Sequence, residues 1–321
     1  MSAPRRRRGD RRRAPPVRGL PTIDLSHWAL RERRPLRGRV AVVAGGTRGA
    51  GRGIAVCLGA AGATVYVTGR SVRGSLATPG RPETIEETAE MISALGGTAI
   101  AMRVDHSQER EVRRLFDRVR RDQHGRLDIL VNDIWGGETL TEWGLPPWKL
   151  SWTKGREMVE QAVFTHILTS RYGVPLLVRR RRGLVVEVTD GAHFRYRGSL
   201  FYDFVKTSVI RLAYGLSEEF REAHLRRVTA LAVTPGFLRS EYMLEQFGVT
   251  ETNWRDGISK APHFYASETP YFLGKAVAAL AADPNVHRKS GKVFGSWQLA
   301  REYRFTDLDG SRPDWGKVMH G

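Results

Sequence analysis

The sequence predicts an α/β protein with a doubly wound parallel sheet that carries helices on both faces. Two observations predict this class. Short apolar runs alternate with longer amphipathic segments from Arg39 to about residue 300, and the first run leads directly into a glycine-rich loop at residues 44–51. Strict alternation of this kind is typical of parallel strands joined by crossover helices. We find no internal repeat and expect one domain at residues 39–300.

The first half of this domain is expected to hold four strands and three helices. The run from Val40 to Ala44 is apolar and rich in β-branched residues, which is typical of a buried strand. Pro82 and Glu83 stand where a helix favours proline and an acid, at its start. The expected strands are residues 40–44, 64–68, 98–104 and 127–131, and the expected helices are residues 51–62, 82–96 and 108–124.

The second half continues the alternation after a long loop that holds Trp135, Trp143, Trp148 and Trp152. We expect these tryptophans to pack the loop or a subunit interface, with a pocket for an apolar or aromatic substrate as the alternative. Trp135, which is close to Asn132, is expected to face the nicotinamide. The expected helices are residues 156–178, 199–223 and 268–282, and the expected strands are residues 184–189, 228–234 and 292–296. Residues 237–267 show no regular pattern, and we expect residues 237–266 to fold over the substrate as a mobile lid. Residues 301–321 are expected to form a C-terminal extension.

The positive charge of the chain is concentrated at its N-terminus. The net charge is +18, and residues 1–39 hold 13 Lys and Arg against 3 Asp and Glu. Arginine blocks flanked by proline cannot bury apolar surface, so we expect residues 1–38 to be a disordered tail. A contact with nucleic acid through this tail is the alternative to a merely solvated extension.

The composition disfavours secreted disulfide-bonded proteins and membrane-spanning proteins. The single cysteine, Cys57, allows no internal disulfide, and we expect it to be a buried apolar residue in a cytoplasmic protein. No uninterrupted apolar run reaches the roughly 18–20 residues that span a bilayer. The nearest run, residues 163–178, is interrupted by His166 and Arg171.

The glycine-rich loop is predicted to bind a dinucleotide. A strand that enters such a loop and then a helix presents backbone N–H groups and a helix N-terminus to a diphosphate. Gly45 would allow the turn, and Gly49 and Gly51 would allow the phosphates and the neighbouring strand to approach closely. The expected cofactor-binding residues of this loop are Gly45, Thr47, Arg48, Gly49, Ala50 and Gly51.

Two arginines favour NADP(H) over NAD(H). An NAD site usually has an acid near the end of the second strand, but this strand ends at Arg70, and Arg48 lies inside the loop. Two guanidinium groups can bind a 2′-phosphate through charge-assisted hydrogen bonds. NAD(H) remains the alternative if both arginines are solvated.

Two further polar residues end strands at the edge of the sheet where ligands bind. Asp105 follows the third strand and could accept a hydrogen bond from the adenine amino group, or could instead cap the helix that starts near Ser107 and Gln108. Asn132 ends the fourth strand beside the expected cofactor cleft.

Tyr202 and Lys206 are the expected proton-transfer pair. They stand four residues apart, so they lie on one face of a helix. An ammonium close to a phenol stabilises the phenolate, so we expect Lys206 to lower the pKa of Tyr202. Lys206 could also reach the ribose of a nicotinamide nucleotide.

Taken together, these motifs make residues 39–297 resemble the short-chain dehydrogenase/reductase family, in a bacterial branch related to the dehydrogenase/reductase member 1 subfamily. The motifs are the loop at 44–51, Asp105, Asn132, residues 202–206 and residues 235–240. The resemblance implies a Rossmann-type domain with a seven-stranded sheet, an NAD(P) cofactor, a small-molecule carbonyl or alcohol substrate, and a homodimer or homotetramer formed through the helices at 156–178 and 199–223. It also implies cofactor contacts by Pro235, Gly236 and Ser240. No metal is implied.

The chain departs from the family pattern at the active site. The family's serine falls on Asp190, after Thr189, and its asparagine falls on Ala162. Asp190 could be protonated and donate a hydrogen bond, Thr189 could supply the hydroxyl instead, or an ionised Asp190 could bind a cationic or imine-like substrate. His193 could hold the carboxylate in place, and a simple turn-capping role is a further alternative.

The sequence therefore predicts an NADP-dependent oxidoreductase with Tyr202, Lys206, Asp190 and Thr189 as its expected catalytic residues. The alternative is an NADP-binding sensor or regulatory protein of the same fold, which has lost catalysis together with the family's serine and asparagine.

Overall fold

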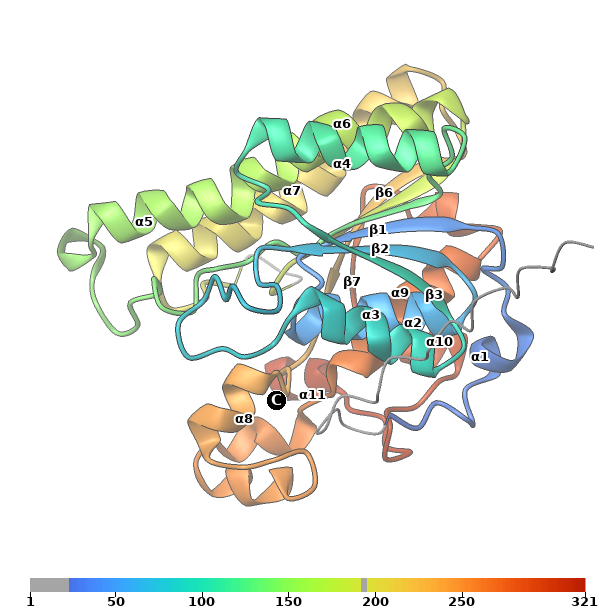
Figure 1. Cartoon of the computed structure of the whole chain (residues 1–321). Helices are drawn as coiled ribbons and strands as arrows, with labels where there is room; N and C mark the ends of the chain where they lie inside the picture. The colour runs from blue at the N-terminus through green and yellow to red at the C-terminus, as the bar shows by residue number, and fades with distance from the viewer. Residues whose placement is uncertain (1–22, 192–194, 321) are drawn as a thin grey trace, which may run out of the picture.

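A computed structural model of the chain describes residues 23–191 and 195–320. Its centre is one seven-stranded sheet with the order β3-β2-β1-β4-β5-β6-β7, in which every neighbouring pair of strands is parallel. The expected doubly wound α/β fold is therefore confirmed (Figure 1). The strands are β1 Val40–Ala44, β2 Thr64–Gly69, β3 Thr98–Arg103, β4 Ile129–Asn132, β5 Gly183–Val188, β6 Val228–Thr234 and β7 Val293–Gly295.

Helices cover both faces of this sheet, and each face has its own hydrophobic core. On one face α2 (Gly49–Ala60), α3 (Ile85–Ala94), α9 (Pro270–Ala282) and α10 (Ser296–Tyr303) pack together, and on the other face lie α4 (Glu109–Asp122), α6 (Thr165–Arg179) and α7 (Leu200–Glu222). Figure 1 shows the two layers above and below the strands. Every residue of β1 is buried, as expected for a central strand between two helical layers.

The strand order reverses between β1 and β4, because β2 and β3 lie on one side of β1 and β4 to β7 lie on the other. In open α/β sheets, ligands bind in the crevice at the carboxyl ends of the strands on either side of such a reversal. The loops that follow β1 and β4 are the glycine-rich loop and the segment that starts at Asp133.

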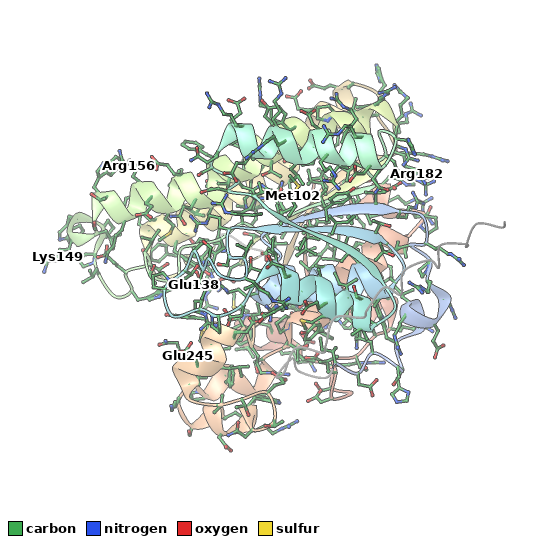
Figure 2. The ribbon with its side chains drawn as sticks, in the orientation of Figure 1. Met102, Glu138, Lys149, Arg156, Arg182 and Glu245 are labelled. Carbon is green, nitrogen blue, oxygen red and sulfur yellow. The ribbon has the colours of Figure 1, made fainter. Side chains whose placement is uncertain are left out.

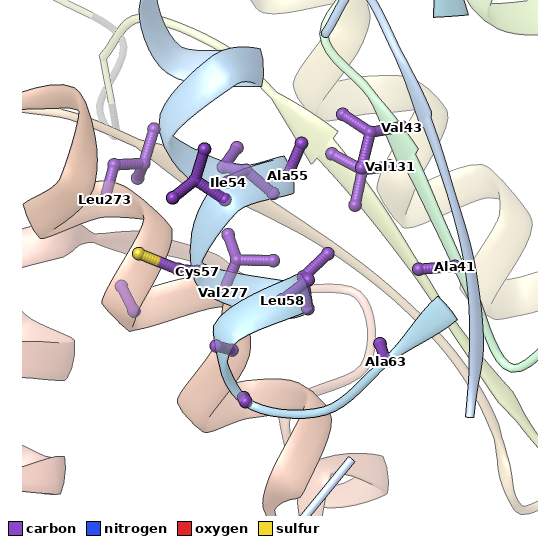
Figure 3. Close-up of a cluster of buried hydrophobic side chains, with 14 of the residues drawn as sticks. Ala41, Val43, Ile54, Ala55, Cys57, Leu58, Ala63, Val131, Leu273 and Val277 are labelled. Atoms are coloured by element: carbon purple, nitrogen blue, oxygen red, sulfur yellow. The ribbon is translucent and has the colours of Figure 1, made fainter. Parts of the chain in front are cut away.

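Helices α2 and α9 cross in close contact within the first core. A Cβ atom added to Gly53 would lie 2.1 Å from the Pro270 carbonyl oxygen, and one added to Gly274 would lie 2.3 Å from that of Gly53. Cys57 is buried in this contact, as predicted (Figure 3). Burial raises the pKa of its thiol to about 12.

The prediction of a disordered tail over residues 1–38 is wrong for its last part. Helix α1 (Ala29–Arg33) lies within it, and Leu25, Trp28 and Leu36 are buried against the first core. These three side chains give residues 23–38 apolar surface to bury, which the arginine blocks lack. The arginine blocks at residues 5–13 lie outside the described residues.

The long helix expected at residues 156–178 is interrupted. Helix α5 (Trp152–Val159) passes through a single π-helical segment, η2 (Glu160–Phe164), into α6. Lys149 and Arg156 mark the end of this arm that projects beyond the sheet (Figure 2). Such π segments often lie next to functional sites, and Ala162, at the position of the family's asparagine, lies in this one.

The segment expected to be irregular, residues 237–267, is largely helical. It contains α8 (Glu241–Phe247) and the short 3₁₀ helices η3 (Trp254–Ser259) and η4 (Pro262–Ala266). The buried Arg239 holds it together, because its guanidinium contacts Glu251 at 2.8 Å and the Ser267 carbonyl at 2.7 Å and lies over the Trp254 ring. Aromatic contacts and local ion pairs of this kind are not visible as a periodic pattern in the sequence. Beyond the sheet, η1 (Pro147–Lys149), η5 (Val286–Lys289) and α11 (Trp315–His320) complete the elements of the described chain.

Candidate active site

The glycine-rich loop leaves β1 and turns back against the loop that follows β4. Gly45 has a φ of +92°, and its N–H donates to the Thr68 carbonyl at 3.1 Å. A Cβ atom at Gly45 would lie 2.1 Å from the Asp133 carbonyl oxygen, and one at Gly51 would lie 2.3 Å from that of Gly45. Any larger residue at either position would push the two loops apart, so the glycines define a tight cradle at the start of α2.

The rest of the loop begins α2. Gly49 is the first residue of this helix and Ala50 the second, while Arg48 is the residue before it. The Gly49 N–H donates to the Glu241 carboxylate at 2.8 Å. The Thr47 carbonyl oxygen accepts from Arg52 Nε at 3.0 Å, which fixes the loop against the first turn of α2.

Arg48 and Arg70 lie on the side of the cradle where β2 ends. Arg48 Nε is 3.1 Å from the Glu83 carboxylate, and Arg48 Nη1 donates to the Thr78 hydroxyl at 3.1 Å. Its buried Nη2 has no hydrogen-bond partner within the described part of the chain. The Arg70 guanidinium lies close to Gly136 and, with Arg103, contributes to a lowered pKa of Asp105. Glu83 is therefore a competitor for the Arg48 charge that the sequence did not reveal.

Asp105 forms hydrogen bonds within the turn before α4, but it does not cap that helix, whose N-cap residue is Gln108. Its Oδ1 accepts from the Ser107 N–H at 3.0 Å and from the Ser107 hydroxyl at 2.7 Å. Hydrogen bonds from Ser107 lower the pKa of Asp105, against the opposing effect of burial. No contact between Asp105 and the glycine-rich loop is seen in the described residues.

Asn132 is fully buried at the end of β4. Its Nδ2 donates to Glu187 Oε1 at 2.8 Å and to the Ser170 hydroxyl at 3.0 Å, and its Oδ1 has no partner among the described residues. Glu187 in turn is 2.6 Å from His166 Nδ1, and His166 Nε2 is 3.1 Å from the Ile134 carbonyl oxygen. This buried network holds the loop after β4. No sequence pattern predicts it, because its members lie far apart in the chain.

The residues after β6 reach the same edge of the sheet. Pro235 lines a cavity of about 300 Å³ beside Asp190. The Gly236 N–H donates to the Glu268 carboxylate at 2.9 Å, and Gly236 lies against Trp315. The Ser240 hydroxyl accepts from the Met243 N–H and caps α8, and its Cβ is 3.7 Å from the position of a Cβ atom built on Gly49.

Tyr202, Asp190 and Arg197 meet directly. The Tyr202 hydroxyl donates to Asp190 Oδ2 at 2.5 Å, and Arg197 Nη2 lies 2.7 Å from both carboxylate oxygens of Asp190. The Asp203 carboxylate accepts from the Arg197 N–H at 3.0 Å and so fixes the loop that precedes α7. Arg197 was missed by the sequence analysis, which assigned the supporting role to His193; that residue lies outside the described residues.

The pKa of Tyr202 is raised well above its ordinary value, mainly by burial and then by the negative charge of Asp190 and the hydrogen bond to it. The expectation that Lys206 lowers this pKa is therefore wrong for this state of the protein. The Lys206 Nζ lies 3.8 Å from the centre of the Trp135 ring but 5.4 Å from that of the Tyr202 ring. Burial also lowers the pKa of Lys206, which Asp190 and Asp133 oppose.

Thr189 does not face Tyr202. Its hydroxyl donates to the Lys206 backbone carbonyl at 2.7 Å, and its side chain is buried. This hydrogen bond already uses its only proton, so Asp190, and not Thr189, is the group next to the phenol.

The surroundings of Tyr202 are otherwise aromatic and apolar. Trp143 lies at 5.0 Å and Trp135 at 5.6 Å from the Tyr202 ring, measured between ring centres. Ala162 belongs to the small apolar cluster that packs on Tyr202, so no polar side chain replaces the family's asparagine there. Trp148 and Trp152 are largely exposed rather than packed into the loop, so their place at a subunit interface stays a prediction.

The cavity beside Asp190 is walled by the C-terminal extension. Its lining combines the edge of the sheet, at Asp190, Arg197 and Pro235, with Trp297, Trp315 and Lys317. No residue of 237–266 lines it within the described chain. The C-terminal extension, for which the sequence predicted no role, therefore forms one wall of this cavity, and the lid role of residues 237–266 stays a prediction.

Comparison with known proteins identifies the family. The family model for short chain dehydrogenases matches residues 39–248. The chain belongs to the short-chain dehydrogenase/reductase family. It is 36% identical over 280 residues to "Dehydrogenase/reductase SDR family member 1" of Mus musculus and 35% identical to that of Homo sapiens, and each alignment covers 86% of this chain and 85% of the relative.

Solved structures agree on the fold. The crystal structure of a hydroxysteroid dehydrogenase from Escherichia coli aligns with a TM-score of 0.63 and 22% sequence identity. The alignment covers 82% of this chain and 97% of the chain of that dehydrogenase. The crystal structure of a metagenomic short-chain oxidoreductase in complex with NADP aligns with a TM-score of 0.60 and 22% sequence identity. That alignment covers 81% of this chain and 96% of the chain of the oxidoreductase. The protein is thus an NAD(P)-dependent short-chain dehydrogenase/reductase.

The geometry of this short-chain dehydrogenase/reductase fits a nicotinamide dinucleotide. The glycine cradle is closed to side chains at Gly45 and Gly51, and the N-terminal N–H of α2 binds a carboxylate, which is an anion with oxygen acceptors like a phosphate. Arg48 Nη2 adds an unpaired donor near the end of β2. Within residues 23–191 and 195–320 no cluster of His, Cys, Asp and Glu could hold a metal ion, and no helix combines the length and apolarity needed to cross a membrane.

Proposed function

We propose that this enzyme is an NADP-dependent oxidoreductase that transfers a hydride between nicotinamide and a carbonyl or alcohol carbon, with Tyr202 as general acid and base. The observation that carries the proposal is the Tyr202 hydroxyl, 2.5 Å from Asp190 at the sheet edge that also carries the glycine-rich loop. The bound cofactor would supply or accept the hydride. Tyr202 would supply the proton that converts the substrate oxygen into a hydroxyl.

We assign Asp190 a carboxylate that holds the Tyr202 hydroxyl at the edge of the sheet. The hydroxyl would turn from Asp190 to the substrate oxygen before it donates its proton. This assignment is supported by Arg197, whose guanidinium contacts both carboxylate oxygens and would stabilise the charged form. A carboxylate alone would repel the negative charge that develops on a carbonyl oxygen. Arg197 compensates that repulsion, so a neutral carbonyl substrate does not need a protonated Asp190. A cationic substrate would have to compete with Arg197 for the same oxygens.

The raised pKa of Tyr202 means that the phenol keeps its proton at neutral pH, which is the form that carbonyl reduction needs. A phenol that keeps its proton is ready to donate, whereas oxidation of an alcohol needs the phenolate. Lys206 and the positive charge of an oxidised nicotinamide would both stabilise the phenolate formed after donation.

The preference for NADP is supported by Arg48 and Arg70 and opposed by Glu83. Arg81 also contacts Glu83, at 2.6 Å, so Arg48 is not the only cation that neutralises this carboxylate. The dissociation constants of NADPH and NADH, measured by fluorescence titration, decide between the two cofactors. An equal or tighter constant for NADH would contradict the preference.

The proton-donor role is tested by Tyr202→Phe. We expect NADPH oxidation with a panel of ketones and aldehydes to fall by a factor of about 10² to 10⁴, while the NADPH dissociation constant changes little, because the phenyl ring keeps the packing and loses only the proton. Retention of most activity would refute the role. Tight NADPH binding without turnover of any substrate by the unmodified enzyme would instead identify a sensor or regulatory protein.

A further inference from the structure

The carboxylate of Glu241 lies on the N-terminus of α2. Its Oε2 accepts from the Gly49 N–H at 2.8 Å, and its Oε1 is 3.4 Å from Arg52 Nη1. Glu241 is the first residue of α8 and follows Ser240, which packs beside Gly49. A residue of α8 thus contacts the glycine-rich loop, 192 positions earlier in the chain.

The N-terminus of α2, where the carboxylate of Glu241 lies, stabilises an anion. The first N–H groups of a helix have no partner within the helix, and the helix dipole adds a partial positive charge there. Gly49 has no side chain to block the approach, and the nearest atom to a Cβ built on it is 3.7 Å away. The carboxylate of Glu241 and a phosphate of a dinucleotide would use the same donor, and their negative charges would repel each other.

We propose that the carboxylate of Glu241 occupies the position that a cofactor phosphate would take at the Gly49 N–H. Glu241 would then limit the affinity for the dinucleotide, because its carboxylate must leave Gly49 before the diphosphate can bind. This inference rests on the proposed function, which requires a dinucleotide at the glycine-rich loop. It assigns to α8 a role in cofactor binding that adds to the lid role predicted from the sequence.

A second carboxylate attaches the same helix to the adenosine side of the cleft. Glu245, one turn after Glu241, forms an ion pair with Arg81, which also contacts Glu83, the partner of Arg48. Figure 2 shows Glu245 on α8, below the layer of the sheet. Glu245 is 63% exposed and makes no contact with the glycine-rich loop in the described residues. It therefore provides a matched control that carries the same charge on the same helix.

The test compares NADPH binding to the full-length enzyme and to Glu241→Ala and Glu245→Ala. Each variant loses one negative charge, so any long-range attraction of the anionic cofactor rises equally in both. We expect Glu241→Ala to lower the NADPH dissociation constant by roughly 5-fold or more, since one charge-assisted hydrogen bond no longer has to break. We expect Glu245→Ala to change it by less than about 2-fold.

Adenosine 2′-monophosphate provides the matched ligand, because it has the 2′-phosphate and lacks the diphosphate. Its dissociation constant should differ by less than about 2-fold between the unmodified enzyme and Glu241→Ala, because only the long-range charge effect acts on it. Equal tightening of NADPH in both variants, equal tightening of both ligands in Glu241→Ala, or no change in any variant would overturn the inference while leaving the proposed function intact. An unmodified enzyme that binds no dinucleotide would overturn both.

Discussion

At the scale of single residues, an aspartate stands where the family places a hydroxyl, and an arginine makes this substitution workable. Asp190 accepts from Tyr202 on one side and from Arg197 on the other. Without the guanidinium, transfer of the Tyr202 proton would leave a phenolate and a carboxylate in contact. Charge compensation by Arg197 is therefore part of the proposed mechanism, and we expect it to appear in the rate of the chemical step.

Replacement of Arg197 by glutamine should lower kcat for carbonyl reduction by roughly 10-fold to 100-fold, because a charge-assisted contact contributes about 1.5–3 kcal/mol. The NADPH dissociation constant should stay within about 2-fold of that of the unmodified enzyme. Steady-state kinetics and fluorescence titration measure the two quantities. Arg195→Gln is the control, since the side chain of Arg195 donates a hydrogen bond to the Met319 carbonyl and forms no ion pair with Asp190 in the described chain. An equal loss in both variants would mean that the loop, and not the charge at Asp190, is responsible.

At the scale of elements, the buried Glu268 joins three parts of the fold. Its Oε2 accepts from the Gly236 N–H after β6 and from the Ser296 hydroxyl at 2.5 Å, at the start of α10, while Glu268 itself precedes α9. Its Oε1 has no partner within the described residues. Burial raises the pKa of Glu268 to about 8, against the effect of these two hydrogen bonds.

This raised pKa makes stability depend on pH. Between the unfolded value of about 4.3 and the folded value of about 8, the folded protein keeps a proton that the unfolded chain has lost. The contribution of the protonated Glu268 is thus fully present below about pH 4.3 and is lost as the pH rises toward 8, by at most ~1.4 kcal/mol per pH unit. Glu268→Gln removes the titration, so its stability relative to the unmodified enzyme should increase from pH 5 to pH 8.

Urea unfolding at four pH values between 5 and 8 measures this difference. Glu302→Gln is the control, because Glu302 is an exposed partner of Lys289 and should leave the pH profile unchanged. Parallel profiles for Glu268→Gln and the unmodified enzyme would show that Glu268 is ionised in the folded protein.

The sequence predicted the elements that depend on local pattern. All seven strands were predicted with boundaries that differ from the structure by at most two residues. The inner strands were recognisable because they are buried and therefore form continuous apolar runs. The interruption of the helix at η2 and the helices within residues 237–267 were not predicted. They depend on tertiary contacts, such as the guanidinium of Arg239 with Glu251, that no periodicity records.

In the candidate site, too, the sequence predicted the residues that belong to local motifs and not those that depend on tertiary contacts. The glycine-rich loop and Tyr202 follow from motifs whose spacing is fixed by one turn or one helix. Other residues of the site act through partners at other places in the chain. Arg197 binds Asp190, 7 positions away, Glu241 binds Gly49, 192 positions away, and Glu187 binds Asn132, 55 positions away. Their roles depend on how loops return to the sheet edge, so the residue types alone could not reveal them.

At the scale of the whole molecule, an apolar surface remains uncovered on η2, α6 and α7. Phe164 and Phe204 are more than half exposed, at 57% and 55%, and Ile167, Leu200 and Tyr214 are also exposed. The spacing of three residues between Phe164 and Ile167, and of four between Leu200 and Phe204, places each pair on one side of its helix. Exposed apolar patches of this kind often mark protein interfaces, and we propose that this surface joins subunits of a homodimer or homotetramer.

Phe204→Lys should disrupt that assembly, because an ammonium group buried in an apolar interface loses its hydration. Sedimentation velocity should show the unmodified enzyme as a dimer or tetramer and the variant as a smaller species at the same concentration. Tyr265→Lys, at a residue that is 60% exposed on η4, should leave the oligomer unchanged. A monomeric unmodified enzyme would refute the proposed interface.

The crossing of α2 and α9 also has a practical consequence. Cys57 is the only sulfhydryl of the chain, and it lies between two helices whose backbones almost touch at Gly53 and Gly274. Alkylating reagents can reach it only when these helices separate, so the rate at which iodoacetamide modifies the native enzyme reports how often the cofactor-binding layer opens. The same seclusion leaves the surface free for a single engineered thiol, to which a fluorophore could be attached without background labelling.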